Sequence, residues 1–381
     1  DFKLINDSLG SQTGDAVLIK FANILKEKLP RAIAIGRLGN DVFAVLIAKA
    51  DFERSILSKN EQQEFYFGTD MNESFPIRSY IGVYNIQDRD LPVSVMCDRA
   101  RMAIATIKGD YHKRIAYYDD ALRKNILREQ EFVADLPDAI ANDQLTMFLQ
   151  PQMSAKGELL GAEALIRWIH PQKGSILPSD FIPVFEKNGL ITDVDQYIWE
   201  AACKQLRKWK DAGREDLYIS VNISPRDFYF LNIYKIFTKL IEKYDINPAN
   251  LKLEITETAI VMDFNRQMKL INKLRQDGFV VEMDDFGSGY SSLNLLKDLH
   301  VDILKIDMAF LKKANDEERS KKILQMIIGL SCRLDMPVIT EGVETAEQVE
   351  FLSKMGCDMF QGYYFGRPMS VEEFESTYLQ H

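Results

Sequence analysis

From about residue 143 onward, short apolar runs alternate with longer segments whose apolar residues recur at helical spacing. Eight runs predict strands at Thr146–Gln150, Leu160–Ile166, Tyr218–Asn222, Leu251–Ile255, Val280–Met283, Ile303–Ile306, Pro337–Thr340 and Met359–Tyr363. Helices are predicted between them at Tyr197–Lys210, Ile233–Lys243, Asn265–Asp277, Arg319–Leu334 and Ala346–Met355. Eight strand-then-helix units over about 240 residues predict an α/β fold, a (β/α)8 TIM-like barrel with its site where the strands end.

The first part of the chain has a different pattern. A helical segment, Ala16–Leu29, precedes two apolar runs, Ala32–Gly36 and Ala44–Ile47, and the turn residues Gly39-Asn40-Asp41 between them predict a hairpin. From Asp119 to Asn142 the sequence is charged, has apolar residues near helical spacing and lacks Gly/Ser-rich stretches, which predicts a stiff connecting helix. We therefore expect domains at 1–118 and 143–381, joined by a helix over 119–142.

Polar residues stand on or just after the predicted barrel strands. They are Glu163, Asn222, Glu254, Asp284, Asp285, Lys305, Glu341 and Gln361. Taken singly, each is most simply a polar strand end beside a turn, since Asp and Gly are common turn residues. The adjacent acids Asp284 and Asp285 would raise each other's pKa unless a cation lay between them. Five carboxylates on strands that converge at one end of a barrel favour a functional site.

The residue types at these positions indicate the kind of site. Carboxylate and amide oxygens without nearby His or Cys favour Mg2+ or Mn2+ over zinc. Two adjacent acids could bridge a two-metal centre, which clamps a phosphodiester and supplies hydroxide at neutral pH. The four histidines and four cysteines are scattered through the sequence and show no metal-ligand spacing. A zinc site or a Ser-His-Asp triad is therefore not expected.

The charge balance limits the partners. Lys and Arg number 47 against 57 Asp and Glu, a formal net charge of -10, so no overall basic field attracts duplex DNA or RNA. No apolar run approaches the roughly 20 residues of a membrane helix, and unpaired cysteines suit a reducing compartment. We expect a cytoplasmic protein, and an upstream membrane anchor or sensor domain before Asp1 stays compatible with this sequence.

The first domain resembles the GGDEF (diguanylate cyclase) domain. The resemblance rests on FKLIND, Gly14-Asp15, RLGNDVF and Ser79–Val83, with a helix from about Asp98 to Lys108, and it is partial and truncated at the N-terminus. In the signature, Asn40 replaces the second Gly and Val42 replaces a metal-binding acid, so the resemblance implies a degenerate domain without cyclase activity. Positions matching the family's nucleotide site, Asn6, Asp15 and Asp41, leave a non-catalytic GTP site open.

The second domain resembles the EAL domain over Gln144 to Glu375. The motifs that carry this resemblance are EALIRW from Glu163, QPQ from Gln150, LPSDFIP, VNIS, LEITE, DDFGSGYSSL, LKID, EGVE and QGYYFGRP. EAL domains are cyclic di-GMP phosphodiesterases that open the ring to linear pGpG, and some members are catalytically silent receptors. The resemblance also implies a homodimer through the barrel.

The EAL resemblance assigns roles to individual residues. It implies metal ligands at Glu163, Asn222, Glu254, Asp284 and Asp285, and catalytic or supporting roles for Lys305, Glu341 and Glu257. It implies substrate contacts from Gln152, Arg167, Asp302, Gln361 and Glu344. Two of these have simple structural alternatives: Lys305 as a counter-ion for the acids, and Glu344 as an acid at a helix start.

The sequence thus predicts metal-dependent hydrolysis of cyclic di-GMP, regulated by a silent GGDEF domain. The alternative is a receptor that binds cyclic di-GMP without cutting it. A third hypothesis, an interaction scaffold without ligand, is compatible only with a chain that binds no nucleotide.

Overall fold

The structure is a computed structural model and describes residues 2, 6–7, 10–55, 57, 65–68, 74–77, 79–110, 113–284, 286, 300–307 and 317–379. The chain divides into two compact units, Asp1–Gln130 and Glu131–His381, with the boundary inside helix α5 (Asp120–Ala141). This helix matches the connecting helix that the sequence predicts within one residue at each end. No helix among the described residues is long and apolar enough to cross a membrane.

Unit Asp1–Gln130 combines helices with paired strands. Its described elements are α2 (Ser11–Lys28), β1 (Ala34–Gly39), β2 (Val42–Leu46), α3 (Lys49–Arg54), β3 (Phe65–Gly68), β4 (Ser74–Ile77), β5 (Ile81–Val83), α4 (Val93–Ile107) and β6 (Ile115–Tyr117). Strands β1 and β2 form the predicted antiparallel hairpin, and Gly39 and Asn40 turn the chain with φ of 132° and 47°. Helix α4 begins five residues before the predicted Asp98, directly after Pro92, which lacks the backbone N–H that a residue inside a helix donates.

Unit Glu131–His381 contains the predicted ring of eight strands. In chain order these are β7 (Leu145–Ser154), β8 (Leu159–His170), β10 (Tyr218–Ile223), β11 (Leu251–Thr256), β12 (Val281–Asp284), β13 (Ile303–Asp307), β14 (Val338–Glu341) and β15 (Met359–Gln361). Each pairs with the next, and β15 pairs with β7, so the sheet closes on itself. Two short strands pair antiparallel with members of the ring: β9 (Gly174–Ile176) with β8, and β16 (Met369–Ser370) with β7.

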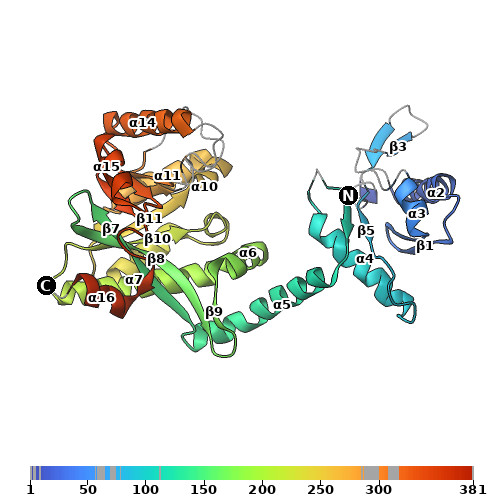
Figure 1. Cartoon of the computed structure of the whole chain (residues 1–381), viewed down its shortest axis with the longest axis horizontal. Helices are drawn as coiled ribbons and strands as arrows, with labels where there is room; N and C mark the ends of the chain where they lie inside the picture. Colours follow the sequence, from blue (N-terminus) through green and yellow to red (C-terminus); the bar gives the residue numbers. More distant parts are fainter. Residues whose placement is uncertain are drawn as a thin grey trace. The chain divides into compact units, whose positions relative to one another are not determined.

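The helices of this unit follow the strands. They are α6 (Pro178–Asn188), α7 (Ile191–Asp211), α8 (Asp227–Phe230), α9 (Ile233–Tyr244), α10 (Glu257–Met262), α11 (Phe264–Gln276), α14 (Glu317–Arg333), α15 (Ala346–Lys354) and α16 (Val371–Tyr378), with a 3-10 turn at Pro248–Asn250. In Figure 1 these helices lie around the strands. Helix α7 starts six residues before the predicted Tyr197, since Ile191 and Val194 bury apolar surface in its first turn.

One strand departs from the predicted strand-then-helix repeat. Strand β7 runs antiparallel to both of its ring neighbours, and only Ala155–Glu158 separate it from β8. A parallel connection needs a dozen or more residues, whereas this tight turn, with Gly157 at φ 78°, can only reverse the chain. The first unit of the barrel is therefore a hairpin, and the prediction of eight strand-then-helix units is wrong there.

Alternation along the strands separates an apolar layer from a polar interior. On β11, Leu251, Leu253 and Ile255 are fully buried within the large apolar cluster that the helices cover. The residues between them, Lys252 and Glu254, point to the opposite face, which is the inside of the ring. The barrel thus has an apolar outer core and a polar centre.

Candidate active site inside the barrel

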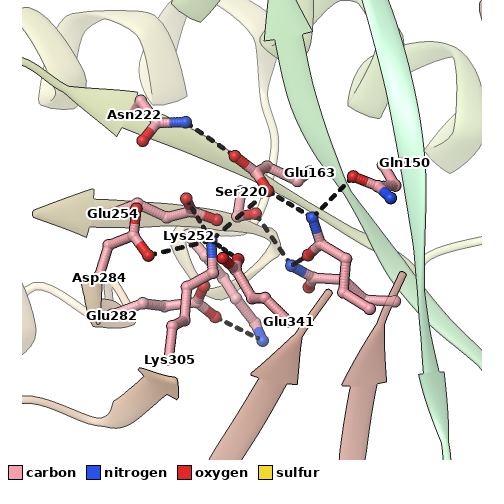
Figure 2. Close-up of polar contacts among 12 residues, drawn as sticks. Gln150, Glu163, Ser220, Asn222, Lys252, Glu254, Glu282, Asp284, Lys305 and Glu341 are labelled. Carbon is pink, nitrogen blue, oxygen red and sulfur yellow. Dashed lines mark hydrogen bonds and ion pairs between the residues drawn. The ribbon is translucent and has the colours of Figure 1, made fainter. Parts of the chain in front are cut away.

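The interior polar residues come from neighbouring strands of the barrel. The parallel register pairs Ser220 with Glu163, Asn222 with Glu254, and Asp307 with Glu341. Asp284 is the last residue of β12 and pairs with Thr256 at the end of β11. Because these positions lie toward the carboxyl ends of the parallel strands, the side chains meet toward one end of the barrel. Figure 2 shows Glu163, Glu254, Asp284 and Glu341 around Lys305.

Lys305 lies at the centre of this group and is 1% exposed. Its Nζ is 2.6 Å from Glu254 Oε2 and 2.6 Å from Glu341 Oε1. It is also 3.5 Å from Glu163 Oε2 and 3.8 Å from Asp284 Oδ1. Burial acts to lower the pKa of Lys305, but these carboxylates outweigh burial and raise it well above its usual value. Lys305 is therefore a permanent ammonium surrounded by acids.

The pKa values of the carboxyl groups shift in different directions. Burial raises the pKa of Glu341 to about 8 despite the nearby Lys305 charge, and burial together with the charge of Glu163 raises the pKa of Glu254 well above its usual value. Burial also acts on Glu163, but Lys305 and hydrogen bonds from Gln361 and Asn222 lower its pKa. The surroundings therefore favour the ionised form of Glu163 and the protonated forms of Glu341 and Glu254.

A chain of amide side chains orients Glu163. Gln361 Nε2 donates to Glu163 Oε2 at 2.6 Å and to Gln150 Oε1 at 3.1 Å. Gln152 Nε2 donates to Gln361 Oε1 at 2.8 Å, and Asn222 Nδ2 donates to Glu163 Oε1 at 2.9 Å. The backbone oxygen of Asn222 accepts a hydrogen bond from Trp199 Nε1 at 2.9 Å. The predicted residues Gln152, Gln361, Asn222 and Glu163 are thus brought into direct contact.

The donor chemistry of this group suits a hard divalent cation. All its acceptors are oxygens, and Glu254 Oε1 is buried without a hydrogen-bond partner among the described residues. In the described part of the chain, no three Asp, Glu, His or Cys side chains are already arranged around a common ion position, and Lys305 Nζ lies among the acids instead. Asp285 lies outside the described residues. Asn222 now points its Nδ2 at Glu163. To ligate a cation there, its side-chain amide would have to rotate so that the oxygen takes the place of the nitrogen.

The remaining predicted residues lie at different distances from this centre. Arg167 stands four residues after Glu163 on β8, so it shares the interior face, and its Nη1 donates to the Ile166 carbonyl at 2.7 Å. Glu344 is exposed in the loop before α15, next to the N-cap Thr345. Glu257 does not continue β11 but is the first residue of α10, where it is buried.

Asp302 is not brought to the site. It directly precedes β13, so it lies at the amino end of that strand, whereas the acids gather toward the carboxyl ends. Its carboxylate accepts hydrogen bonds from Arg275 Nε and from the Val281 backbone N–H, each at 2.9 Å, and forms an ion pair with Arg275 Nη2 at 2.7 Å. Asp302 thus connects helix α11 to the start of β12, and the structure does not bring it to the group of acids around Lys305.

The residues of the predicted GTP site lie in unit Asp1–Gln130. Asn6 packs on Gly14 so closely that a Cβ on Gly14 would lie 1.9 Å from Asn6 Oδ1. That oxygen is buried and has no hydrogen-bond partner among the described residues. Asp15 is exposed on α2, and Asp41 is exposed in the hairpin turn.

Sequence reasoning assigned no role to three further interior residues, Tyr218, Lys252 and Glu282. Lys252 stands two residues before Glu254 and Glu282 two before Asp284, so both face the inside of the ring. The alternation of the strands was the signal that could have placed them there.

The chain is thus an α/β barrel protein with a polar centre, in which acids surround a buried lysine near the carboxyl ends of the strands. The model of the EAL domain family matches residues 133–368, and that of the diguanylate cyclase GGDEF domain matches residues 1–114. The chain belongs to the EAL domain family and carries a GGDEF domain ahead of the barrel.

Curated relatives share this two-domain arrangement with the chain. The signaling protein YkoW of Bacillus subtilis is 34% identical over 100% of this chain and 48% of its own length. MucR of Pseudomonas aeruginosa, described as a bifunctional diguanylate cyclase/cyclic di-GMP phosphodiesterase, is 32% identical over 98% of this chain and 55% of its own. The chain spans about half the length of the curated relatives it matches.

Solved structures agree with the fold of the barrel. The PaMucR phosphodiesterase in complex with c-di-GMP is 36% identical, with a TM-score of 0.61 over 64% of this chain and 99% of that chain. The EAL enzyme Bd1971 in its form bound to cAMP and cyclic-di-GMP is 29% identical, with a TM-score of 0.62 over 75% of this chain and 74% of that chain.

Proposed function

We propose that the barrel hydrolyses cyclic di-GMP to linear pGpG with the help of Mg2+ or Mn2+. The observation that carries this proposal is the convergence of Glu163, Glu254, Asp284 and Glu341 on Lys305 within hydrogen-bond or ion-pair distance. The likeness to a phosphodiesterase solved with c-di-GMP supports this substrate. Because the chain carries a net charge of -10, a polyanionic substrate needs local positive charge.

The residues that would hold the cations are Glu163, Asn222, Glu254 and Asp284, with Asp285 as the second-metal ligand implied by the resemblance. Bound cations of this kind polarise a phosphoryl oxygen and lower the pKa of a bound water. Gln361 and Asn222 hold Glu163 in one orientation, so its carboxylate is placed before any ligand arrives.

The chain's own residues then divide the remaining work. Arg167 on β8 is placed to contact a phosphate of the substrate, since it shares the interior face with Glu163. Lys305 Nζ donates toward the attacking oxygen and balances the surrounding acids. Glu341, in its ionised form, accepts the proton from the attacking water.

The test is incubation of the purified chain with cyclic di-GMP and Mg2+ or Mn2+, with pGpG followed by chromatography. Turnover that requires the metal supports the proposal. Absence of turnover at saturating metal and substrate contradicts it.

A second function has one observation in its favour. The described acids enclose Lys305 and are not already arranged around an ion, which would suit a receptor that binds cyclic di-GMP without cutting it. Micromolar binding of cyclic di-GMP without turnover would identify this receptor. In both cases we propose that the GGDEF domain is regulatory, because Val42 cannot ligate a metal.

A further inference from the structure

Lys252 and Glu282 form a second charge pair inside the barrel, outside the set of residues assigned to the reaction. Lys252 Nζ is 3.0 Å from Glu282 Oε1, and both side chains are buried. Figure 2 shows this pair beside the group around Lys305. Charges this deeply buried are rare unless they are paired, so each depends on the other.

The pair lies directly beside the proposed metal ligands. In the β11–β12 register Glu282 is the partner of Glu254, and both carboxylates face the interior. Like charges on neighbouring strands repel one another. A different lysine offsets each of the two charges: Lys305 Nζ lies 2.6 Å from Glu254 Oε2, and Lys252 Nζ lies 3.0 Å from Glu282 Oε1.

An aromatic ring fixes Lys252 in this arrangement. The Lys252 ammonium lies 3.3 Å from the centre of the Tyr218 ring, a close cation–π contact. Tyr218 is on β10, and its hydroxyl is buried without a hydrogen-bond partner in the part of the chain that the structure describes. The ring therefore holds Lys252 mainly through its face and directs the ammonium toward Glu282.

We propose that Lys252 and Glu282 are positioning residues that keep Lys305 on Glu254 and Glu341 and set the net charge around the cation ligands. This inference rests on the proposed function. Without Lys252, the Glu282 carboxylate would compete with Glu254 for Lys305 and add one negative charge beside the ligands. Without the Glu282 charge, Lys252 would add one positive charge there.

The test measures Mg2+ binding by calorimetry in the absence of nucleotide. Glu282→Gln should weaken Mg2+ binding and Lys252→Met should tighten it, each on the order of tenfold, because a single charge inside a protein acts strongly over a few ångströms. The double variant, Lys252→Met with Glu282→Gln, should return to the wild-type affinity. Glu282→Asp, which keeps the charge, should stay close to wild type.

The control is Glu375→Gln, a carboxylate-to-amide change between α7 and α16, where Glu375 accepts from Gln205 and Trp209. It should leave Mg2+ affinity unchanged. If Lys252 and Glu282 had a purely structural role, substituting either one would lower stability, and the two substitutions would not shift Mg2+ affinity in opposite directions. If Lys252→Met does not fold, Glu282→Gln and Glu282→Asp decide: equal affinities in these two variants overturn the inference.

The outcomes separate this inference from the proposed function. Wild-type turnover together with shifts of the same sign in both single variants overturns the inference and leaves the phosphodiesterase standing. Opposite shifts without any wild-type turnover support the inference and contradict hydrolysis. A wild-type chain that binds no Mg2+ overturns the inference and the metal-dependent reaction together.

Discussion

Glu163 is the residue on which the proposed chemistry depends most. Lys305 and hydrogen bonds lower the pKa of Glu163 despite its burial, and three side chains hold it in place. Glu163→Gln keeps the shape but removes the negative charge, so we expect turnover to fall by about two to three orders of magnitude or more, as when a preorganised charged group is lost. The production of pGpG measures this, and an unchanged rate would remove Glu163 from the metal ligands.

A second prediction at the residue scale concerns the contribution of Lys305 to stability. Lys305→Met leaves several buried carboxylates without their ammonium, which should destabilise the barrel by about 3–5 kcal/mol. Added Mg2+ should recover part of the loss, because a cation replaces the missing charge. Thermal unfolding with and without Mg2+ tests this, with Lys354→Met as the control, since Lys354 pairs only with Glu350 on the surface in the described structure. Equal losses in the two variants would contradict the central role of Lys305.

Single residues also show where sequence reasoning was limited. The acids were found because they stand at the ends of apolar runs, and the structure brings the described ones together around Lys305. Sequence reasoning grouped Asp302 with the site residues although it precedes its apolar run, a position that puts it at the amino end of the strand, away from the carboxyl ends where the acids gather. The Lys252–Glu282 pair requires the register between two strands, which no single run reveals.

At the scale of elements, the segment after β10 holds a pair of buried acids. Asp227 Oδ2 accepts from the Ser224 N–H at 2.8 Å, and Asp195 of α7 interacts electrostatically with Asp227. Burial raises the pKa of Asp227 to about 6. The folded protein therefore retains a proton that the unfolded chain releases near pH 4, and stability from this group falls as pH rises from about 4 to about 6.

This linkage gives a pH prediction. The stability that the protonated Asp227 contributes is fully present below about pH 4 and is lost as the pH rises toward about 6. Asp227→Asn cannot ionise, so its stability should decline less than that of the wild type over this range. The difference between their melting temperatures as a function of pH tests this. Parallel pH profiles would show that Asp227 titrates normally in the folded protein.

Helix α5 offers a packing prediction. Phe132 is 2% exposed and its ring lies 5.4 Å from that of Trp168, in an apolar cluster with Phe181 and Phe185. Phe132→Ala should destabilise the unit Glu131–His381 by about 3–5 kcal/mol. Leu127→Ala on the same helix is the control, because Leu127 is 46% exposed. Denaturant unfolding measures both, and similar losses would contradict the packing of α5 onto the barrel.

The prediction of elements succeeded where periodicity carried the information. All eight ring strands lie where the apolar runs predict them, because alternation and length suffice to identify a buried strand. Strand direction is not encoded in that alternation. The antiparallel β7 follows from the length of the Ala155–Glu158 turn, which is too short for a helical crossover.

At the scale of the whole molecule, the first unit decides whether the protein also makes cyclic di-GMP. Val42 occupies the position of a metal-binding acid in the hairpin, so we expect no conversion of GTP to cyclic di-GMP. Incubation of the purified chain with GTP and Mg2+ tests this, with MucR of Pseudomonas aeruginosa, described as bifunctional, as the positive control. Formation of cyclic di-GMP from GTP would contradict it.

GTP could still act as a signal. If the unit Asp1–Gln130 keeps a GTP site at Asn6, Asp15 and Asp41, hydrolysis of cyclic di-GMP should change when GTP is added. Asp15→Ala should then remove the GTP effect while leaving the basal rate unchanged. A rate that is independent of GTP at millimolar concentration would assign regulation to another input.

The closure of the ring also bears on how the protein is made. The Gln152–Gln361 hydrogen bond joins residues 209 positions apart, and β15 must reach β7 before the strands can close. A nascent chain leaving the ribosome therefore carries most of the acids long before their last neighbours emerge. Such distant contacts form slowly, and incomplete barrels expose unpaired strands. Production of this protein should thus depend on chaperones and on translation through the last strand.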